Sequence, residues 1–409
     1  MNTTLRTWRQ LLQDDPVPRT GRYEPRSSGL TAALRIVESG VLDSGPGLRA
    51  VPSAGAVHPY EILVVADDDG RPALFQVDPA RRVCLRTEAS PLLLPDPPRG
   101  GAHVLLLTRP WLSMRKYGRR GYLYVQLDLA HLATNLLGVA LSLGVDAALR
   151  LRLPREAMRE RLGRFGAHRE IHSVLTLGPS PGAAVAGWRF RDGTFRAQDA
   201  LLDDLESLCW NGLPPGLVDG SGTPNAAVRA PLVAGEGSLA VARWADLSRK
   251  RRSSKGFAPG AVATTAVTAV AGTALATDLG LDQDRVVMSV VEPHGADTDH
   301  VVSACHDQEH LRHASAFAVF HTDSGDTGAE SHLLREDLFR AGAAGQLLYL
   351  GAAAERVGVT AVGGFSPRAW RELAGLPAGR EVLYLVALGR DGVQTVKLDR
   401  GERATAHGE

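Results

Sequence analysis

Two long stretches of the chain combine apolar residues with many small ones, and each ends in a Gly-Val pair. They cover residues 129–145 and residues 343–359. This pattern predicts two long helices, and the small residues would let each helix approach a neighbour closely. Each stretch is followed by a segment that contains an Arg-Glu pair, at 154–162 and at 367–373, and both segments are expected to form short helices.

Two similar strand patterns follow these short helices, at residues 173–178 and 384–389. The shared order of long helix, turn, short helix and strand favours an internal duplication. Upstream in the first repeat, residues 60–66 and 72–77 flank an Asp-Asp-Asp-Gly turn, which predicts a hairpin rather than a calcium site. Residues 285–291 occupy the corresponding place in the second repeat. The predicted fold class is therefore α+β, with antiparallel sheet and large packed helices present twice.

The length of 409 residues is sufficient for two domains with a connector. The stretch between residues 182 and 243 is dense in Gly, Pro and Ala after position 211, which predicts a strap or flexible link. We therefore expect an N-terminal domain over residues 20–190, a linker over 191–240 and a C-terminal domain over 241–395.

Composition and charge argue against several classes of partner. Hydrophobic residues make up 44% and charged residues 22%, an ordinary balance for a soluble globular protein. The net charge of +1 gives no general attraction to nucleic acid or to an anionic membrane. No apolar run approaches the roughly 20 residues that span a bilayer, and the first residues lack the apolar core of a signal peptide. Cys84, Cys209 and Cys305 form neither a disulfide framework nor a paired metal motif, so we expect a reducing cytoplasm.

The most specific string in the chain covers residues 49–61 and leads straight into a predicted strand. Its small residues let main-chain amides approach a planar ring, and glycine adopts backbone angles that larger residues resist. The string resembles the flavin-contacting loop of the nitroreductase superfamily, and within it the SagB-type azoline dehydrogenases of peptide natural-product pathways. The resemblance implies an FMN-dependent nitroreductase fold in tandem, with cofactor contacts from Pro52, Ser53, Ala54, Gly55 and His58.

A second string, residues 251–257, resembles the opening motif of the same superfamily. There an Arg, a Ser two places on and a Lys or Arg two places further hold the flavin phosphate and ribityl chain, which here implies Arg251, Ser253 and Lys255. Two cations and a hydroxyl around one dianion suit charge-assisted phosphate binding, with a basic surface patch as the alternative. Arg390, directly after the last predicted strand, is also expected to contact the cofactor.

A third string, residues 359–365, resembles the superfamily turn whose backbone amide faces the flavin N5 edge. A hydrogen bond at N5 stabilises the reduced ring as charge develops, in the manner of an oxyanion hole. The implied residues are Gly363 and Gly364, although a Gly-Gly pair after a helix is also a common helix terminator.

The two repeats do not contain the same three strings. The first repeat has Leu149 and Arg150 in the place of the Gly-Gly pair, and its phosphate motif is at most the remnant at residues 26–28. Nothing like the Pro-Ser-Ala-Gly loop precedes Arg285 in the second repeat. In the family's homodimers, the phosphate motif and Gly-Gly turn of one subunit meet the Pro-Ser loop of the other. The resemblance therefore implies an intramolecular pseudo-dimer, compatible with a monomeric chain, that binds one FMN.

A Lys-Tyr pair, Lys116 and Tyr117, precedes the first long helix. It matches a pair associated with catalysis in SagB-type dehydrogenases, which plain nitroreductases lack; a basic loop with an aromatic staple is the alternative. The family's Gly-His near the helix start is here Ala130-His131. Aromatising an azoline removes a proton from one ring carbon and a hydride from its neighbour, so a base is needed beside FMN. A desolvated lysine can serve because its pKa is lowered, and which residue of the pair is the base stays open.

The resemblance implies oxidation of thiazolines or oxazolines to thiazoles or oxazoles in a ribosomally made peptide, as in antibiotic biosynthesis. One alternative is an NAD(P)H-dependent reductase of nitro compounds, quinones or flavins, and another is a non-catalytic scaffold subunit of a cyclodehydratase complex. Dioxygen is the expected oxidant of FMN, and no GxGxxG string follows a predicted strand.

Two further expectations concern partners and metals. The roughly 25 residues before the first helix are too few for a leader-binding domain, so we expect a companion cyclodehydratase or leader-binding protein. Cys305, His306, His310 and His313 have spacings that could gather a metal on a helix. The acidic residues among them favour a solvated face instead, and no metal is predicted.

Overall fold

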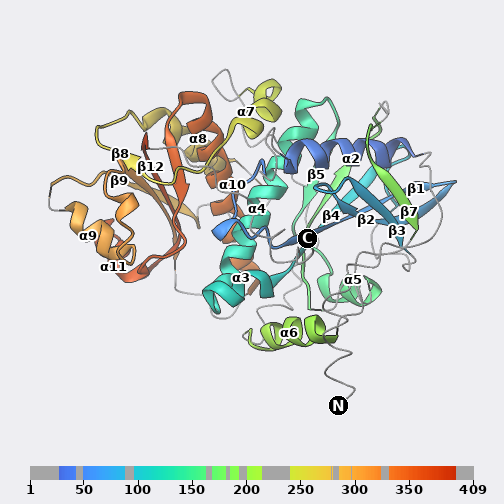
Figure 1. Cartoon of the computed structure of the whole chain (residues 1–409), viewed down its shortest axis with the longest axis horizontal. Helices are drawn as coiled ribbons and strands as arrows, with labels where there is room; N and C mark the ends of the chain where they lie inside the picture. The colour runs from blue at the N-terminus through green and yellow to red at the C-terminus, as the bar shows by residue number, and fades with distance from the viewer. Residues whose placement is uncertain are drawn as a thin grey trace, which may run out of the picture.

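The two longest helices of the computed structural model pack against each other between two sheets (Figure 1). Helix α4 covers Arg120–Ser142 and helix α10 covers Ser331–Glu355, which confirms both predicted long helices. A side chain at Gly342 of α10 would press against the carbonyl oxygen of Leu127 and the methyl group of Ala130. The close approach expected from the small residues is therefore present at this crossing.

The structure describes residues 27–42, 49–87, 96–162, 168–180, 185–192, 200–213, 240–277, 279, 285–295, 297–323 and 331–392. Within these ranges the shorter helices are α2 (Ser28–Val41), α3 (Pro110–Tyr117), α5 (Arg155–Leu162), α6 (Ala200–Asn211), α7 (Trp244–Lys250), α8 (Thr265–Ala276), α9 (Asp297–Ala304) and α11 (Pro367–Leu373). Helices α5 and α11 are the two short helices that the repeated Arg-Glu segments predict. No helix in the described part of the chain is both long and apolar enough to cross a membrane.

The two sheets share a strand order over four strands each. The first sheet has the order β5 (Ala147–Arg150), β6 (Ile171–Leu177), β4 (Ala102–Thr108), β1 (Tyr60–Asp68), β2 (Arg71–Asp78), β3 (Val83–Thr87) and β7 (Arg189–Asp192). The second has the order β11 (Gly358–Ala361), β12 (Arg380–Asp391), β10 (Ala316–Asp323) and β9 (Val287–Val291), with β8 (Phe257–Ala258) paired to β12. The order β5-β6-β4-β1 thus matches β11-β12-β10-β9, and the connecting helices α4 and α5 match α10 and α11. Such a match is what an internal duplication produces.

The predicted hairpin is confirmed, and a side chain closes its turn. Strands β1 and β2 pair antiparallel, and the amide of Gly70 donates to Asp67 Oδ1 over 2.9 Å. The aspartate run is therefore a turn, as expected.

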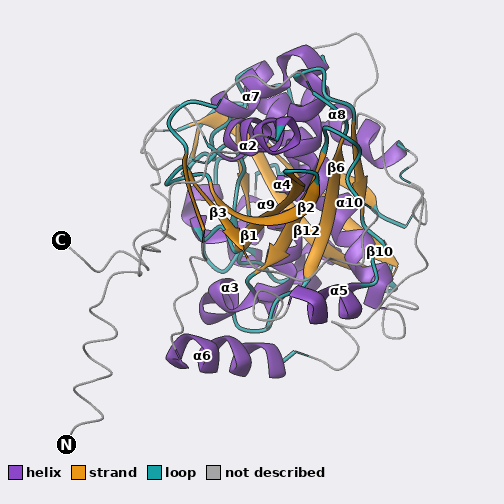
Figure 2. Cartoon of the chain, turned by 90° about the vertical axis from the view of Figure 1, so that its right-hand side faces the viewer, coloured by secondary structure: helices purple, strands orange, loops and turns teal. Residues whose placement is uncertain are grey.

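Residues 214–239, on whose composition the predicted strap or flexible link rests, lie outside the described residues, whereas the described part of the connector before them holds regular structure. Strand β7 adds to the first sheet by parallel pairing with β3. Helix α6 packs against α3 (Figure 2), and its buried Glu206 accepts two hydrogen bonds from Arg169, of 3.1 and 3.2 Å. Sequence analysis missed this helix, although Leu201, Leu202, Leu205 and Leu208 recur at helical spacing.

Asn135 in α4 joins four elements in the core. Its amide nitrogen donates to Gly40 O over 2.8 Å. Its oxygen accepts from Trp244 Nε1 at 2.9 Å, Ser248 Oγ at 2.6 Å and Gln346 Nε2 at 3.1 Å. A buried amide satisfied in this way specifies one arrangement of α2, α4, α7 and α10, because any other would leave polar groups unpaired.

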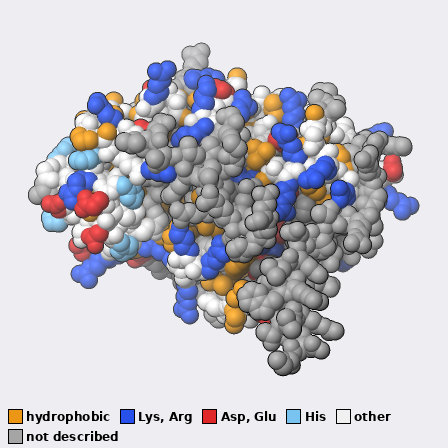
Figure 3. Space-filling view, in the orientation of Figure 1, with side chains coloured by type: hydrophobic (Ala, Val, Ile, Leu, Met, Phe, Trp, Pro, Cys, Tyr) orange, Lys and Arg blue, Asp and Glu red, His pale blue; other side chains and the backbone are white. Residues whose placement is uncertain are grey.

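Basic side chains are spread over both parts of the molecule on the face shown in Figure 3. This distribution agrees with the net charge of +1.

Candidate active site

The loop at residues 52–58 is held in place by a carboxylate from α4. Ser53 Oγ donates to Asp128 Oδ2 over 2.6 Å, and the amide of Ala54 donates to Asp128 Oδ1 over 3.1 Å. The amide of His58 in turn donates to Ser53 Oγ over 2.8 Å. Burial raises the pKa of Asp128 to about 7, while the hydrogen bonds from Ser53 and Ala54 act in the opposite direction. Sequence analysis missed Asp128, although an acidic residue among the apolar positions of a helix is a signal that could have found it.

Lys116 and Tyr117 lie directly against this loop. They form the carboxyl end of α3, and Gly118 ends the helix with a φ of 58°. Gly55, in the short turn Ala54–Ala56, has a φ of 66°, which favours glycine. A methyl group added to Gly55 would collide with Lys116 Nζ and Tyr117 Oη. Both the backbone angle and the close approach of these two side-chain ends therefore favour glycine at position 55.

Tyr117 also reaches the other half of the molecule. A methyl group added to Gly363 would lie 4.0 Å from Tyr117 Cε1, with no other described atom within that distance. Lys116 Nζ lies 5.0 Å from the centre of the Tyr117 ring. The structure thus brings together Gly55, Lys116, Tyr117 and Gly363, which come from three separate strings of the sequence.

Arg251 connects the phosphate motif to the first half. It follows the end of α7 and is buried. Its Nε donates to Ala50 O over 3.0 Å and its Nη2 donates to Arg49 O over 3.1 Å. Its Nη1 donates to Ser253 Oγ over 3.3 Å. A guanidinium presents five N–H groups in a rigid fork, and three of them hold this segment together. Sequence analysis did not foresee that this arginine also holds the segment before the loop.

Ser253 extends the connection to the Gly-Gly string. Its hydroxyl donates to Tyr349 Oη over 3.2 Å, and the same tyrosine oxygen accepts from the amide of Ala361 over 2.8 Å. The neighbouring Ser254 pairs with Val359 through two hydrogen bonds of 2.8 and 3.1 Å. The phosphate motif and the strand that leads to the 363–365 turn are therefore one connected unit.

Arg390 lies against the segment that follows the phosphate motif. It is on β12, in register with Ala258 on β8. A methyl group added to Gly260 would lie 3.3 Å from the Arg390 guanidinium carbon. Lys255, within the motif, is half-buried.

Comparison with known proteins gives one family match. Residues 283–390 match the Nitroreductase family. No curated protein matches.

One solved structure extends the likeness of fold to nearly the whole chain. A protein from Anabaena variabilis, named only as a candidate nitroreductase, is 17% identical, with a TM-score of 0.59 over 96% of this chain and 90% of its own. Nitroreductase A from Vibrio parahaemolyticus is 20% identical, with a TM-score of 0.32 over 40% and 73%. A nitroreductase-like protein from Bacillus cereus is 15% identical, with a TM-score of 0.30 over 42% and 97%. The first comparison shows that both halves together have this fold.

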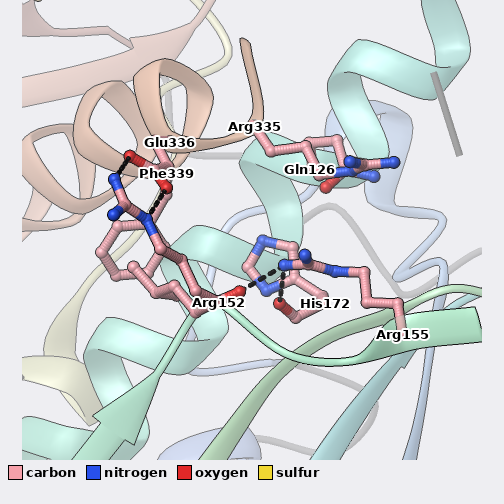
Figure 4. A pocket seen from close by; sticks show the side chains of 8 residues that line it. Gln126, Arg152, Arg155, His172, Arg335, Glu336 and Phe339 are labelled. Carbon is pink, nitrogen blue, oxygen red and sulfur yellow. Dashed lines mark hydrogen bonds and ion pairs between the residues drawn. The ribbon is translucent and has the colours of Figure 1, made fainter. Parts of the chain in front are cut away.

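The place related to this site by the repeat is filled with side chains (Figure 4). Arg152, just after β5, donates from Nε to Glu336 Oε1 over 2.6 Å and from Nη2 to Oε2 over 2.9 Å. The cavity that remains is about 10 Å³, which is room for about one water molecule. Its lining residues are Gln126, Leu151, Arg152, Arg155, His172, Arg335, Glu336 and Phe339. Leu149, expected to close this niche of the nitroreductase-type fold, is itself fully buried.

Glu170 organises the rest of this filled niche. It accepts from Tyr122 Oη over 2.7 Å and from Gln126 Nε2 over 3.0 Å. Arg335 of α10 forms an ion pair with it, and Arg155 Nε lies 3.6 Å from its Oε1. This buried network closes the niche across the two halves. It could not be predicted from either string alone, because its members come from four segments.

Leu149 and Arg150, expected in the place of the Gly-Gly pair, lie inside β5, whereas Gly363 and Gly364 follow the end of β11. The corresponding place after β5 is therefore that of Arg152, which lines the niche.

A surface cavity of about 350 Å³ lies on the other side of the phosphate motif. Arg252 and Ser254 line it, together with Gly358 and Asp391, whereas Arg251 and Ser253 do not. Alternate residues of the motif therefore face different surroundings. Within the described ranges, no cluster of His, Cys, Asp or Glu could hold a metal ion.

Proposed function

We propose that the chain binds one FMN between its halves and oxidises thiazolines or oxazolines of a peptide to the aromatic azoles. The observation that carries the proposal is the position of the Lys-Tyr pair. Both residues lie against Gly55 in one half, and Tyr117 also lies beside Gly363 in the other. Beyond a hydride acceptor, this oxidation needs a proton acceptor next to the flavin. The Lys-Tyr pair lies where the flavin-contacting strings of both halves meet.

The residues around the pair fit FMN. Arg251, Lys255 and Arg390 supply positive charge along one segment, as a phosphate dianion requires. Gly363 has open space on its Cβ side, since Tyr117 is the one described neighbour within 4.0 Å. A flat ring can therefore approach the backbone of the turn.

Bound FMN supplies the acceptor for the hydride that leaves one carbon of the azoline ring. The chain supplies the acceptor for the proton that leaves the neighbouring carbon, and the ring gains a double bond. The acceptor would be either Lys116 as the neutral amine or Tyr117 as the phenolate, which becomes an ammonium or a phenol as it takes the proton. Asp128 fixes the loop against which both groups lie, through Ser53 Oγ and the amide of Ala54.

The second candidate function is NAD(P)H-dependent reduction of nitro compounds, quinones or flavins. It is favoured by the names of the solved structures, which are nitroreductases. The two functions differ in the direction of electron flow, because the first takes electrons from its organic substrate and the second takes them from a nicotinamide.

The decisive experiment uses a precursor peptide whose azoline rings have already been formed. The purified chain with bound FMN, air and no NAD(P)H should remove two hydrogen atoms per ring, as seen by mass spectrometry. Lys116→Ala serves as the matched control with the same cofactor. If the peptide stays unchanged while NAD(P)H supports reduction of a nitro compound or quinone, the second candidate replaces the first. Because the rings must be formed first, we also propose a cyclodehydratase or leader-binding protein as the partner.

A further inference from the structure

Each of the three carbonyl groups in the turn at residues 363–365 is bound by a side chain. Tyr124 Oη donates to the first carbonyl. Gln308 Nε2 donates to the second over 2.6 Å. Arg120 Nη1 donates to the third over 2.8 Å. Three consecutive carbonyls held by side chains are unusual for a surface turn, where water commonly serves as the partner.

The three side chains come from both halves of the molecule. Arg120 and Tyr124 are four residues apart at the start of α4, so they lie on the same face of that helix. The Arg120 guanidinium also lies 4.1 Å from the centre of the Phe365 ring. Gln308 follows α9 in the second half, and its amide nitrogen also donates to Cys305 O over 2.6 Å. The turn is therefore held from two directions.

Holding a carbonyl also orients the amide that follows it. The peptide unit is planar and trans, so the C=O of one residue and the N–H of the next point in opposite directions. The bonds from Tyr124 and Gln308 thus fix the N–H groups of Gly364 and Phe365. A Gly-Gly sequence would otherwise allow these peptide planes to rotate, since glycine has the widest choice of backbone angles.

We propose that Tyr124 and Gln308 are positioning residues that fix the Gly364 and Phe365 amides of the 363–365 turn as donors to the flavin ring. The bond from Arg120 to Phe365 O has another effect, because the N–H that follows it, on Ser366, donates to Ala304 O over 2.8 Å. The proposal rests on the proposed function, because it requires FMN at this site. Donors fixed before the reaction stabilise developing charge without having to reorganise. Tyr124 and Gln308 therefore act on the cofactor through the backbone.

The protonation state of the Tyr124 hydroxyl suits a permanent hydrogen-bond donor. Burial raises its pKa to about 12; the positive charge of Arg120 opposes the increase and Tyr117 adds to it. Tyr124 therefore keeps the proton that it donates at any pH at which the protein would be assayed. Its ring also contacts Tyr117 edge-on, with 5.0 Å between the centres.

The test measures the reduction potential of the bound FMN in the full chain. Tyr124→Phe and Gln308→Leu each remove an uncharged donor from the turn and should weaken binding of reduced FMN about tenfold relative to oxidised FMN, which makes the two-electron potential about 30 mV more negative. Binding of oxidised FMN should change little, because the phosphate contacts are untouched.

Tyr122→Phe is the matched control, because Tyr122 lies on the same helix but bonds to Glu170 in the filled niche. Its FMN should keep the potential of the wild-type protein. If Tyr124→Phe and Gln308→Leu also leave the potential unchanged, or if Tyr122→Phe shifts it equally, the positioning role is wrong while the proposed function stands. A chain that binds no FMN overturns both.

Discussion

Asp128 offers the sharpest test of how the cofactor loop is held, because its two simplest replacements should behave differently. Asp128→Asn keeps an oxygen that accepts from Ser53 or Ala54 and removes the ionisable group. Asp128→Ala removes the acceptor altogether and leaves two donors of the loop without it. At about pH 4, where the carboxyl is still protonated in the folded chain, the alanine variant should lose about 2–4 kcal/mol of stability and hold FMN less tightly, since unsatisfied buried donors are costly.

The ionisation of Asp128 gives this prediction a pH dependence. Burial raises the pKa of the carboxyl from 3.8 to about 7, so the folded chain holds a proton that the unfolded chain has already lost between these values. Stability should therefore fall as pH rises from about 4 to about 7. Each unit of pKa difference between the folded and unfolded chain corresponds to about 1.4 kcal/mol. The folded chain should therefore be about 4 kcal/mol less stable above about pH 7, where Asp128 is ionised, than below about pH 4, where it is protonated. Asp128→Asn should lack this loss.

Urea unfolding of wild type and Asp128→Asn from about pH 4 to about pH 8 measures the difference directly. Comparing the two proteins cancels the titration of the other carboxyl groups. The asparagine variant should gain stability relative to wild type as pH rises. A constant difference, or a wild type that gains relative stability at higher pH, would show that hydrogen bonds outweigh burial at this carboxylate.

Three further predictions concern the site itself. Lys116→Ala and Tyr117→Phe should each slow azoline oxidation by about 10²–10⁴-fold with FMN still bound, because a proton acceptor affects the chemical step; loss of FMN, measured by absorbance, would make the pair structural. Lys255→Ala should release FMN during purification, since a charged phosphate contact contributes about 1.5–3 kcal/mol, and full occupancy would contradict its role. Gly55→Ala should displace the Lys116 amine and slow azoline oxidation far more than Gly70→Ala does. Gly70→Ala is the control, because it introduces the same backbone strain at a position where no atom lies within 4 Å. Equal oxidation rates for the two variants would place the reaction elsewhere.

Much of the fold could be predicted because it depends on local patterns. The apolar and small residues of α4 and α10 gave both long helices, and the repeated Arg-Glu segments gave α5 and α11. The hairpin followed from alternation around a turn whose first aspartate accepts from Gly70. Such signals lie within a few residues of one another in the sequence.

The parts that were missed depend on contacts between distant residues. Asp128 binds a serine 75 positions away, and Arg120 binds a carbonyl 245 positions away. The Glu170 network likewise joins α4, α5 and α10, and each member alone is an ordinary polar residue. Arg251 was expected to bind phosphate, and no pattern in its motif indicated that it also holds the carbonyls of Arg49 and Ala50.

The amount of FMN bound per chain tests the central claim most directly. The proposed function has one site that the two halves complete together, and the place related to it by the repeat holds the Arg152–Glu336 pair with a cavity of about 10 Å³. Cofactor released from a known amount of chain, saturated with FMN and freed of excess, should therefore amount to one FMN per chain. Two FMN per chain, or none, would contradict the account.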